Sequence, residues 1–356
     1  MQRYSRQIIL PEFGDTVQQK LLQSKVLVIG AGGLGVPVLQ YLSAAGVGEI
    51  GVMDGDILEL TNLQRQVLYD ETEIGKNKAV VAVEKLKKFN SEIKFNVFNF
   101  FLDQDHVFEL VEKYDIIVDC TDNFATRYLV NDVCYWLNKY LVFTSIFQYE
   151  AQLSVFHYGE NPFNLRDIFS DIPDKTSVPD CNEAGVVGVL AGIAGCFQAN
   201  EVLKIITGIG DVISGKLQLF NAKDNSNIQI GLTKNKQAFL PTSKQDILDR
   251  NYDFSCESFF SIHNIKELER IMNLEKSCLI DVREFEELPK VTAFPCLEIP
   301  LGGLKQNLSE LNNFEHWIFI CQSGVRSRKA IQILNENRSN TTKIYQVENG
   351  FQIFES

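Results

Sequence analysis

The sequence has eight cysteines in 356 residues, but no two of them are spaced as Cys-x-x-Cys. In a cytosolic chain of this length we expect free thiols rather than disulfides. Most of these thiols should behave as small buried hydrophobic residues.

The sequence also lacks a basic run and an N-terminal signal-peptide region, and we expect no apolar run that approaches the length of a membrane span. Its 46 acidic and 34 basic residues give a formal net charge of −12, which argues against a nucleic-acid partner. We therefore expect a soluble, cytoplasmic protein with neither a nucleic-acid nor a membrane partner.

A glycine-rich turn follows a short apolar segment near the start of the chain. Val26 to Ile29 predict a strand buried on both faces. A strand that turns tightly into a helix presents backbone N–H groups and the positive end of the helix dipole to an anion. Asp54 closes the next apolar strand, about where an acid binds a nucleotide ribose. The pattern predicts a nucleotide site, and an NAD-dependent oxidoreductase is its default interpretation. The glycines that fit Gly-x-Gly-x-x-Gly are Gly30, Gly32 and Gly35, with Gly33 between them.

Apolar strands alternate with helical segments through the first two thirds of the chain. This alternation predicts an α/β fold with a doubly wound, Rossmann-like, mostly parallel sheet. Two later segments alternate apolar and polar residues, which suits antiparallel strands added at one end. The expected strands are 26–29, 50–53, 94–98, 115–120, 141–144, 151–156 and 216–220, and the expected helices are 38–45, 76–89 and the glycine-containing 187–206.

A polar, broken stretch divides the chain. We predict a first domain over 1–232, a linker over 233–257 and a small α/β domain over 258–356. Residues 161–182 hold three prolines and little apolar patterning, which indicates a long functional loop.

Charged residues follow the predicted strands of the first domain. A site that breaks a triphosphate needs cations for the leaving pyrophosphate and an acid for Mg²⁺, whereas hydride transfer needs little positive charge. Arg65 and Lys78 can supply the cations, and Asp122 the metal ligand. Each alone is typical of a solvated surface charge, but all of them follow strand ends near one crevice.

Four motifs of the first domain together resemble the MoeB/ThiF/HesA family, the prokaryotic relatives of ubiquitin-activating enzymes. The resemblance implies that ATP reacts with the C-terminal Gly-Gly carboxylate of a ubiquitin-like sulfur carrier protein, giving an acyl-adenylate and pyrophosphate. The motifs are Arg3 to Gln7, Gly30 to Gly35, Asn62 to Gln66 and Cys120 to Asn123.

The resemblance also implies roles for single residues. Asp54, with Asp56 beside it, belongs to the nucleotide site and holds the ribose. Asn62, Arg65 and Lys78 bind the triphosphate, and Asp122 binds Mg²⁺. Arg6, from the N-terminal arm, reaches the nucleotide of the other subunit in a homodimer.

Two further family features concern cysteines. Cys181, followed by Ala184-Gly185-Val186, resembles the family's crossover-loop cysteine, which is functional in some members and dispensable in others. Many members hold a structural zinc with two Cys-x-x-Cys pairs, whose places here are Asn161 to Asn164 and the cysteine-free stretch 234–240. Because four thiolates are the usual closed set, we predict no structural zinc.

The last third of the chain contains a second candidate site, Cys321-Gln322-Ser323-Gly324-Val325-Arg326. Backbone N–H groups around such a loop form a nest that, with Arg326, is expected to lower the thiol pKa. The loop is one residue shorter than the Cys-x₅-Arg loop of cysteine phosphatases, which suits a sulfur atom better than a phosphate. With Leu279 to Glu284 it resembles a rhodanese domain, which implies that Cys321 carries a sulfane sulfur and that Asp281 and Arg283 support the loop.

The two resemblances combine into one functional prediction. The first domain would adenylylate the carrier, and the Cys321 persulfide, loaded from a persulfide or thiosulfate donor, would attack the adenylate. Reduction, or attack by Cys181, would then release a carrier thiocarboxylate. Molybdopterin biosynthesis is favoured, with the thiamine-pathway carrier as the alternative. An NAD-dependent oxidoreductase and a non-catalytic carrier-binding scaffold remain the rivals from other classes.

Overall fold

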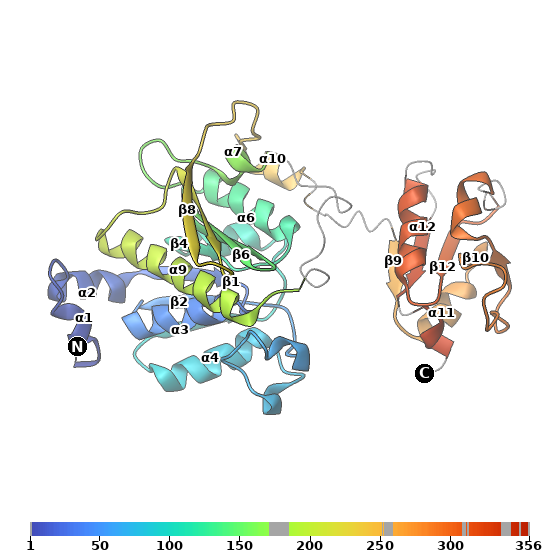
Figure 1. Ribbon diagram of the computed structural model, residues 1–356, viewed down its shortest axis with the longest axis horizontal. Coiled ribbons are helices and arrows are strands. Elements are labelled where there is room, and N and C mark those ends of the chain that lie inside the picture. Colours follow the sequence, from blue (N-terminus) through green and yellow to red (C-terminus); the bar gives the residue numbers. More distant parts are fainter. Residues whose placement is uncertain are drawn as a thin grey trace. The chain divides into compact units, whose positions relative to one another are not determined.

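The chain folds into two compact units, Met1–Phe254 and Ser255–Ser356, in the computed structural model shown in Figure 1. The structure describes residues 2–170, 185–250, 252, 259–307, 311, 313–335, 343–348 and 350–354.

The first unit is built on an eight-stranded sheet in the order β3-β2-β1-β4-β5-β6-β7-β8. The first five strands in the chain run parallel, and the last three pair antiparallel. The predicted mostly parallel sheet with an antiparallel extension is therefore confirmed. The strands are β1 (Lys25–Ile29), β2 (Glu49–Met53), β3 (Lys94–Phe98), β4 (Ile116–Asp119), β5 (Tyr140–Phe147), β6 (Glu150–Phe156), β7 (Lys216–Asn221) and β8 (Ser226–Gly231).

Helices cover both faces of this sheet (Figure 1). Along β1, Val26 and Val28 belong to the core that includes α3, α4 and α9, while Leu27 and Ile29 belong to the opposite core with α5 and α6. Because successive side chains of a strand point to opposite faces, a fully apolar strand is what a doubly wound sheet requires. The helices are α1 (Ser5–Ile8), α2 (Gly14–Gln23), α3 (Gly35–Ala45), α4 (Lys78–Phe89), α5 (Val107–Glu112), α6 (Phe124–Trp136), α7 (Leu165–Ile168), α9 (Gly188–Thr207) and α10 (Lys244–Leu248).

Helix α9 is long and apolar enough, by length and composition, to cross a membrane, so the expectation that no apolar run reaches that length is wrong. The helix instead packs on α3 and β5. A Cβ at Gly188 would lie 2.3 Å from the Gln64 carbonyl oxygen, and one at Gly195 2.5 Å from that of Leu34. These two glycines therefore permit close packing, whereas Gly192 faces open space.

Part of the predicted linker belongs to the first unit. Ile247, in α10, is fully buried, and Gln104 donates hydrogen bonds to the carbonyl oxygens of Ile247 and Arg250 at 2.9 Å. The Tyr252 hydroxyl donates to Asp132 Oδ2 at 2.6 Å. Because this stretch is polar overall, the sequence pattern did not indicate the few residues that anchor it on α6.

The second unit is a five-stranded parallel sheet in the order β11-β10-β12-β13-β9. Its strands also face two cores, one containing α12 and the other α11. The predicted small α/β fold is confirmed: strands are expected from the sequence at 277–281, 317–321 and 343–347, and the structure adds β9 and β11 to them. Its elements are β9 (Phe259–Ile262), α11 (Ile265–Met272), β10 (Ser277–Asp281), β11 (Cys296–Glu298), β12 (His316–Ile320), α12 (Val325–Asn335), β13 (Lys343–Val347) and two 3₁₀ segments, Leu301–Gln306 and Gly350–Phe354.

Candidate active site

Three strands of the first unit end level with one another. Ile29 pairs with Met53 of β2 on one side and with Asp119 of β4 on the other. The segments that follow are the glycine turn, Asp54 to Asp56, and Cys120 to Asn123. They therefore leave the same edge of the sheet, where the strand order reverses and where ligands bind in open α/β sheets.

The glycine turn is too tight for side chains at its two ends. Gly30 has a φ of +98°, and a Cβ there would lie 2.6 Å from the carbonyl oxygen of Cys120. A Cβ at Gly35 would lie 1.9 Å from the Gly30 carbonyl oxygen. Between them, the Cβ position of Gly33 lies 3.3 Å from Arg65 Cγ, so the stem of Arg65 passes over the turn.

Asp54 braces the turn from the end of β2. Its Oδ2 accepts from the Ala31 N–H at 2.8 Å, and its Oδ1 accepts from the Asp56 N–H at 2.9 Å. Burial raises the pKa of Asp54, and these two hydrogen bonds oppose that effect. The predicted ribose ligand is thus also part of the scaffold of the turn.

Lys78 is the first residue of α4, and its side chain is nearly buried. Its Nζ forms an ion pair with Asp56 Oδ2 at 2.9 Å. The hydroxyl of Tyr69 donates to the Ala31 carbonyl oxygen at 2.7 Å and also lies 3.3 Å from the Lys78 carbonyl oxygen. Lys78, Asp56 and the glycine turn therefore form one connected structure.

Gln66 is a residue of this site whose role the motif reading left undefined. Its side chain is 3% exposed, and its Oε1 has no hydrogen-bond partner among the described residues. Its Nε2 lies 3.5 Å from the Cβ position of Gly32. An unpaired buried amide oxygen beside the turn is a group that a bound ligand can satisfy. Asn62, by contrast, uses its Oδ1 to accept from the Glu59 N–H, so that atom already serves the local chain.

Of two further predicted site residues, the structure brings Asp122 to the edge of the site but does not bring Arg6 to it. Asp122 is exposed, on the edge of the sheet that carries the glycine turn. Arg6 is not brought to the site of its own chain, because Gln7 donates to the carbonyl oxygen of Ala45, at the opposite end of α3 from Gly35. Cys181 lies outside the described residues.

The two segments that correspond to the family's zinc pairs lie side by side. Lys234 Nζ contacts the Pro162 carbonyl oxygen and lies 3.3 Å from Asp167 Oδ2, while Asp167 Oδ1 accepts from the Asn235 N–H at 2.9 Å. Asp167 also accepts from the Asn164 N–H at 2.8 Å. Within the described ranges no group of three or more His, Cys, Asp or Glu residues could hold a metal ion. A carboxylate and an ammonium connect these segments.

We expect Asp167→Ala to destabilise the first unit by about 2–3 kcal/mol, because two backbone N–H groups lose their acceptor. Chemical denaturation of the purified chain measures this change. Glu160→Ala, at an exposed position nearby, is the control and should stay within about 0.5 kcal/mol of wild type. Equal stability of the two variants would show that the contacts of Asp167 contribute nothing.

The second unit places Cys321 directly after β12, under the loop that leads into α12. Its side chain is buried, and its Sγ lies 3.6 Å from the Ser327 hydroxyl, which donates to the Gly324 carbonyl oxygen at 2.8 Å. Gly324 has a φ of +84°, and a Cβ there would lie 1.9 Å from the Glu348 carbonyl oxygen. The N–H groups of the first turn of α12 have no acceptors within the helix, so they can bind an anion held by the loop.

Asp281 and Arg283 support this loop, as the resemblance implied. Their side chains form a buried ion pair at 2.8 Å. The guanidinium of Arg283 also lies 3.5 Å from the ring centroid of Phe351, whose N–H donates to the Cys321 carbonyl oxygen at 3.1 Å.

Comparison with known proteins assigns the family. The profile of the ThiF family matches residues 4–239. The chain belongs to the ThiF family. The family predicted from the four sequence motifs is thereby confirmed, and the chain is an enzyme of the adenylyltransferase class.

Three similar proteins place this ThiF family chain more narrowly. The adenylyltransferase and sulfurtransferase MOCS3 of Caenorhabditis briggsae is 35% identical, over 94% of this chain and 89% of its own. The sulfur carrier protein adenylyltransferase of Thermus thermophilus is 44% identical, over 66% of this chain and 88% of its own. The crystal structure of E. coli MccB with ATP matches with a TM-score of 0.59 and 25% identity, over 67% of this chain and 74% of that one. The first alignment extends well beyond the ThiF match, so the similarity includes the second unit.

Proposed function

We propose that the first unit uses ATP to adenylylate the C-terminal Gly-Gly carboxylate of a ubiquitin-like sulfur carrier protein, and that Cys321 then supplies sulfur to it. The observation that carries this proposal is the connected set at the switch point of the sheet. Arg65 passes over the glycine turn, and Lys78 is tied to the turn through Tyr69. Cations beside an N–H-lined turn are suited to a triphosphate.

The chemistry asks little of the protein beyond position and charge. The carrier carboxylate is already ionised and attacks the α-phosphorus, while the bond to pyrophosphate breaks and pyrophosphate leaves with the electron pair. No general base is needed, because the nucleophile has no proton to lose. Arg65 and Lys78 stabilise the charge that develops on the leaving group.

We also propose that Asp122 is the ligand for Mg²⁺ in this site. An exposed carboxylate on the ligand-binding edge of the sheet fits a hard cation that keeps several water ligands. Bound Mg²⁺ would supply further charge neutralisation for pyrophosphate. We propose that no structural zinc is bound and that the enzyme acts as a homodimer, in which Arg6 reaches the nucleotide of the partner. The position of the arm at the far end of α3 is compatible with that assignment.

In the second stage the Cys321 persulfide attacks the carbonyl carbon of the acyl-adenylate and AMP leaves. The resulting acyl disulfide is cleaved by a thiol, either Cys181 or an external reductant, which releases the carrier thiocarboxylate. Molybdopterin synthase is the favoured destination, since the relatives include a probable molybdopterin-synthase adenylyltransferase of Porphyra purpurea, 36% identical over 98% of this chain and 91% of its own. The thiamine-pathway carrier is the second candidate.

One experiment separates these possibilities. The protein is incubated with ATP, Mg²⁺, thiosulfate or an organic persulfide, a reductant, and carriers ending in Gly-Gly, and the carrier mass is then measured. We expect an AMP adduct without a sulfur donor and a thiocarboxylate with one. Absence of both from every carrier would refute the enzymatic proposal and leave a carrier-binding scaffold, while NAD binding would favour an oxidoreductase.

A further inference from the structure

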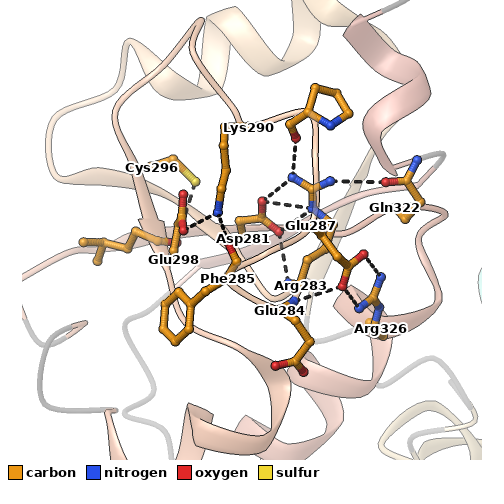
Figure 2. Close-up of polar contacts among 12 residues, drawn as sticks. Asp281, Arg283, Glu284, Phe285, Glu287, Lys290, Cys296, Glu298, Gln322 and Arg326 are labelled. Atoms are coloured by element: carbon orange, nitrogen blue, oxygen red, sulfur yellow. Dashed lines mark hydrogen bonds and ion pairs between the residues drawn. The ribbon is translucent and has the colours of Figure 1, made fainter.

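The Cys321 loop is held from one side by the segment that follows β10. Arg283 Nη1 donates to Gln322 Oε1 at 3.2 Å, and Glu287 accepts from both terminal nitrogens of Arg326, one of them at 2.8 Å. Figure 2 shows the guanidinium of Arg326 and the carboxylate of Glu287 facing each other in this paired arrangement. The only arginine of the Cys-x₄-Arg loop thus has a carboxylate partner from outside the loop.

This pairing changes the charge that the loop offers to a ligand. The hydrogen bonds from Arg326 hold the pKa of Glu287 down to about 2, so its carboxylate stays ionised at neutral pH. The hydrogen bonds with Glu287 also raise the pKa of Arg326. Arg326 is the second residue of α12 and the last residue of the Cys-x₄-Arg loop, so its charge belongs to the loop that would hold an anion, but Glu287 offsets that charge. The anion-binding capacity that remains comes from the N–H groups at the start of α12.

We propose that Glu287 is a specificity-determining residue for the sulfur donor: by pairing with Arg326 it weakens the attraction of the Cys321 loop for dianionic oxyanion donors. The inference rests on the sulfur-transfer role proposed for Cys321. Glu287 acts through Arg326 and touches neither the donor nor the sulfur.

The donor reaction that tests this is simple. The Cys321 thiolate attacks the outer sulfur of thiosulfate, the S–S bond of thiosulfate breaks, and sulfite leaves with the electron pair. Cyanide carbon then attacks the outer sulfur of the persulfide, giving thiocyanate and returning the thiolate. An organic persulfide reacts in the same way: the thiolate attacks its outer sulfur, the S–S bond breaks and the organic sulfur leaves as a thiol, but the persulfide group carries one charge at most.

The experiment uses the full chain and compares Glu287→Gln with wild type. Freeing one positive charge beside a dianion is expected to raise kcat/KM for thiosulfate about fivefold at low salt. The gain should fade toward 1 M salt, where charges are screened within about 3 Å. With an organic persulfide the change should be clearly smaller. Glu286→Gln is the matched control, because it removes the same charge from the adjacent position, and it should stay within about twofold of wild type.

The double variant Glu287→Gln/Arg326→Gln tells whether Arg326 transmits the effect. We expect it to lose the thiosulfate gain. If Glu287→Gln changes kcat/KM equally for both donors at all salt concentrations, the inference is overturned, because Glu287 then has a structural role only. If wild type places no sulfur on Cys321 from either donor, the proposed function fails as well, and mass measurement of the chain distinguishes that case.

Discussion

Replacing Lys78 by methionine is expected to slow carrier-dependent exchange of pyrophosphate into ATP by about 100- to 1,000-fold. The reason is that Lys78 is fixed before the nucleotide arrives. It begins α4, its side chain is nearly buried, and its Nζ is held by Asp56 at 2.9 Å. A cation so placed stabilises developing charge without reorganising.

Stability should barely change in this variant, because Asp56 is half exposed and such pairs contribute about 0–1 kcal/mol. Lys76→Met, in the same turn but exposed, is the matched control and should keep the wild-type exchange rate. Loading of sulfur onto Cys321 should be unaffected in both variants. Unchanged exchange in Lys78→Met would remove this residue from the ATP site.

The second large effect concerns stability rather than chemistry. Arg166→Met is expected to cost the first unit about 3–5 kcal/mol, because it leaves the buried carboxylate of Asp132 without its countercharge. Both side chains are fully buried and lie 2.8 Å apart, and Arg166 also lies over the ring of Tyr128 at 4.7 Å. Among the residues that the structure describes, the other donors to Asp132 are neutral, from Asn131 and Tyr252.

Fluorescence of Trp136 can measure this change in a Trp317→Phe background, since these are the two tryptophans and Trp136 ends α6 of the first unit. Lys85→Met, which breaks surface ion pairs with Asp70 and Glu73, is the control and should cost about 1 kcal/mol or less. The double variant Arg166→Met/Asp132→Asn should lose less than the sum of its two single variants. Full additivity would mean that the pair does not stabilise the fold as a unit.

The sequence predicted those parts of the fold where burial leaves a periodic pattern. The apolar runs of β1 and β4 are buried on both faces and were predicted correctly. β8 (Ser226–Gly231) was missed because nearly all of its side chains are exposed, so it carries no apolar alternation. β11 was missed because three residues are too few to show a period. The α10 region was taken for a linker because Ile247 and Tyr252 are isolated anchors in a polar stretch.

Site prediction had a similar limit. The motifs predicted which residues follow the strands. The strand register in the structure then shows that the glycine turn, Asp54 and Asp122 lie at one edge of the sheet. The pairing of Lys78 with Asp56 and the unpaired oxygen of Gln66 depend on side-chain contacts that no spacing encodes. Glu287 was missed because its carboxylate lies 39 positions from Arg326 in the sequence, in a stretch that reads as an ordinary charged surface.

The hydrogen bond from the Tyr252 hydroxyl to Asp132 determines where the chain can be cut so that the two units can be studied separately. A fragment that stops at residue 232 would omit α10 and remove one hydrogen-bond donor from Asp132. If such a fragment were insoluble, that result would not show that the first unit is unable to fold alone. A fragment that continues through residue 254 keeps that contact. Deletion work on this enzyme should therefore cut beyond that tyrosine, on the side of β9.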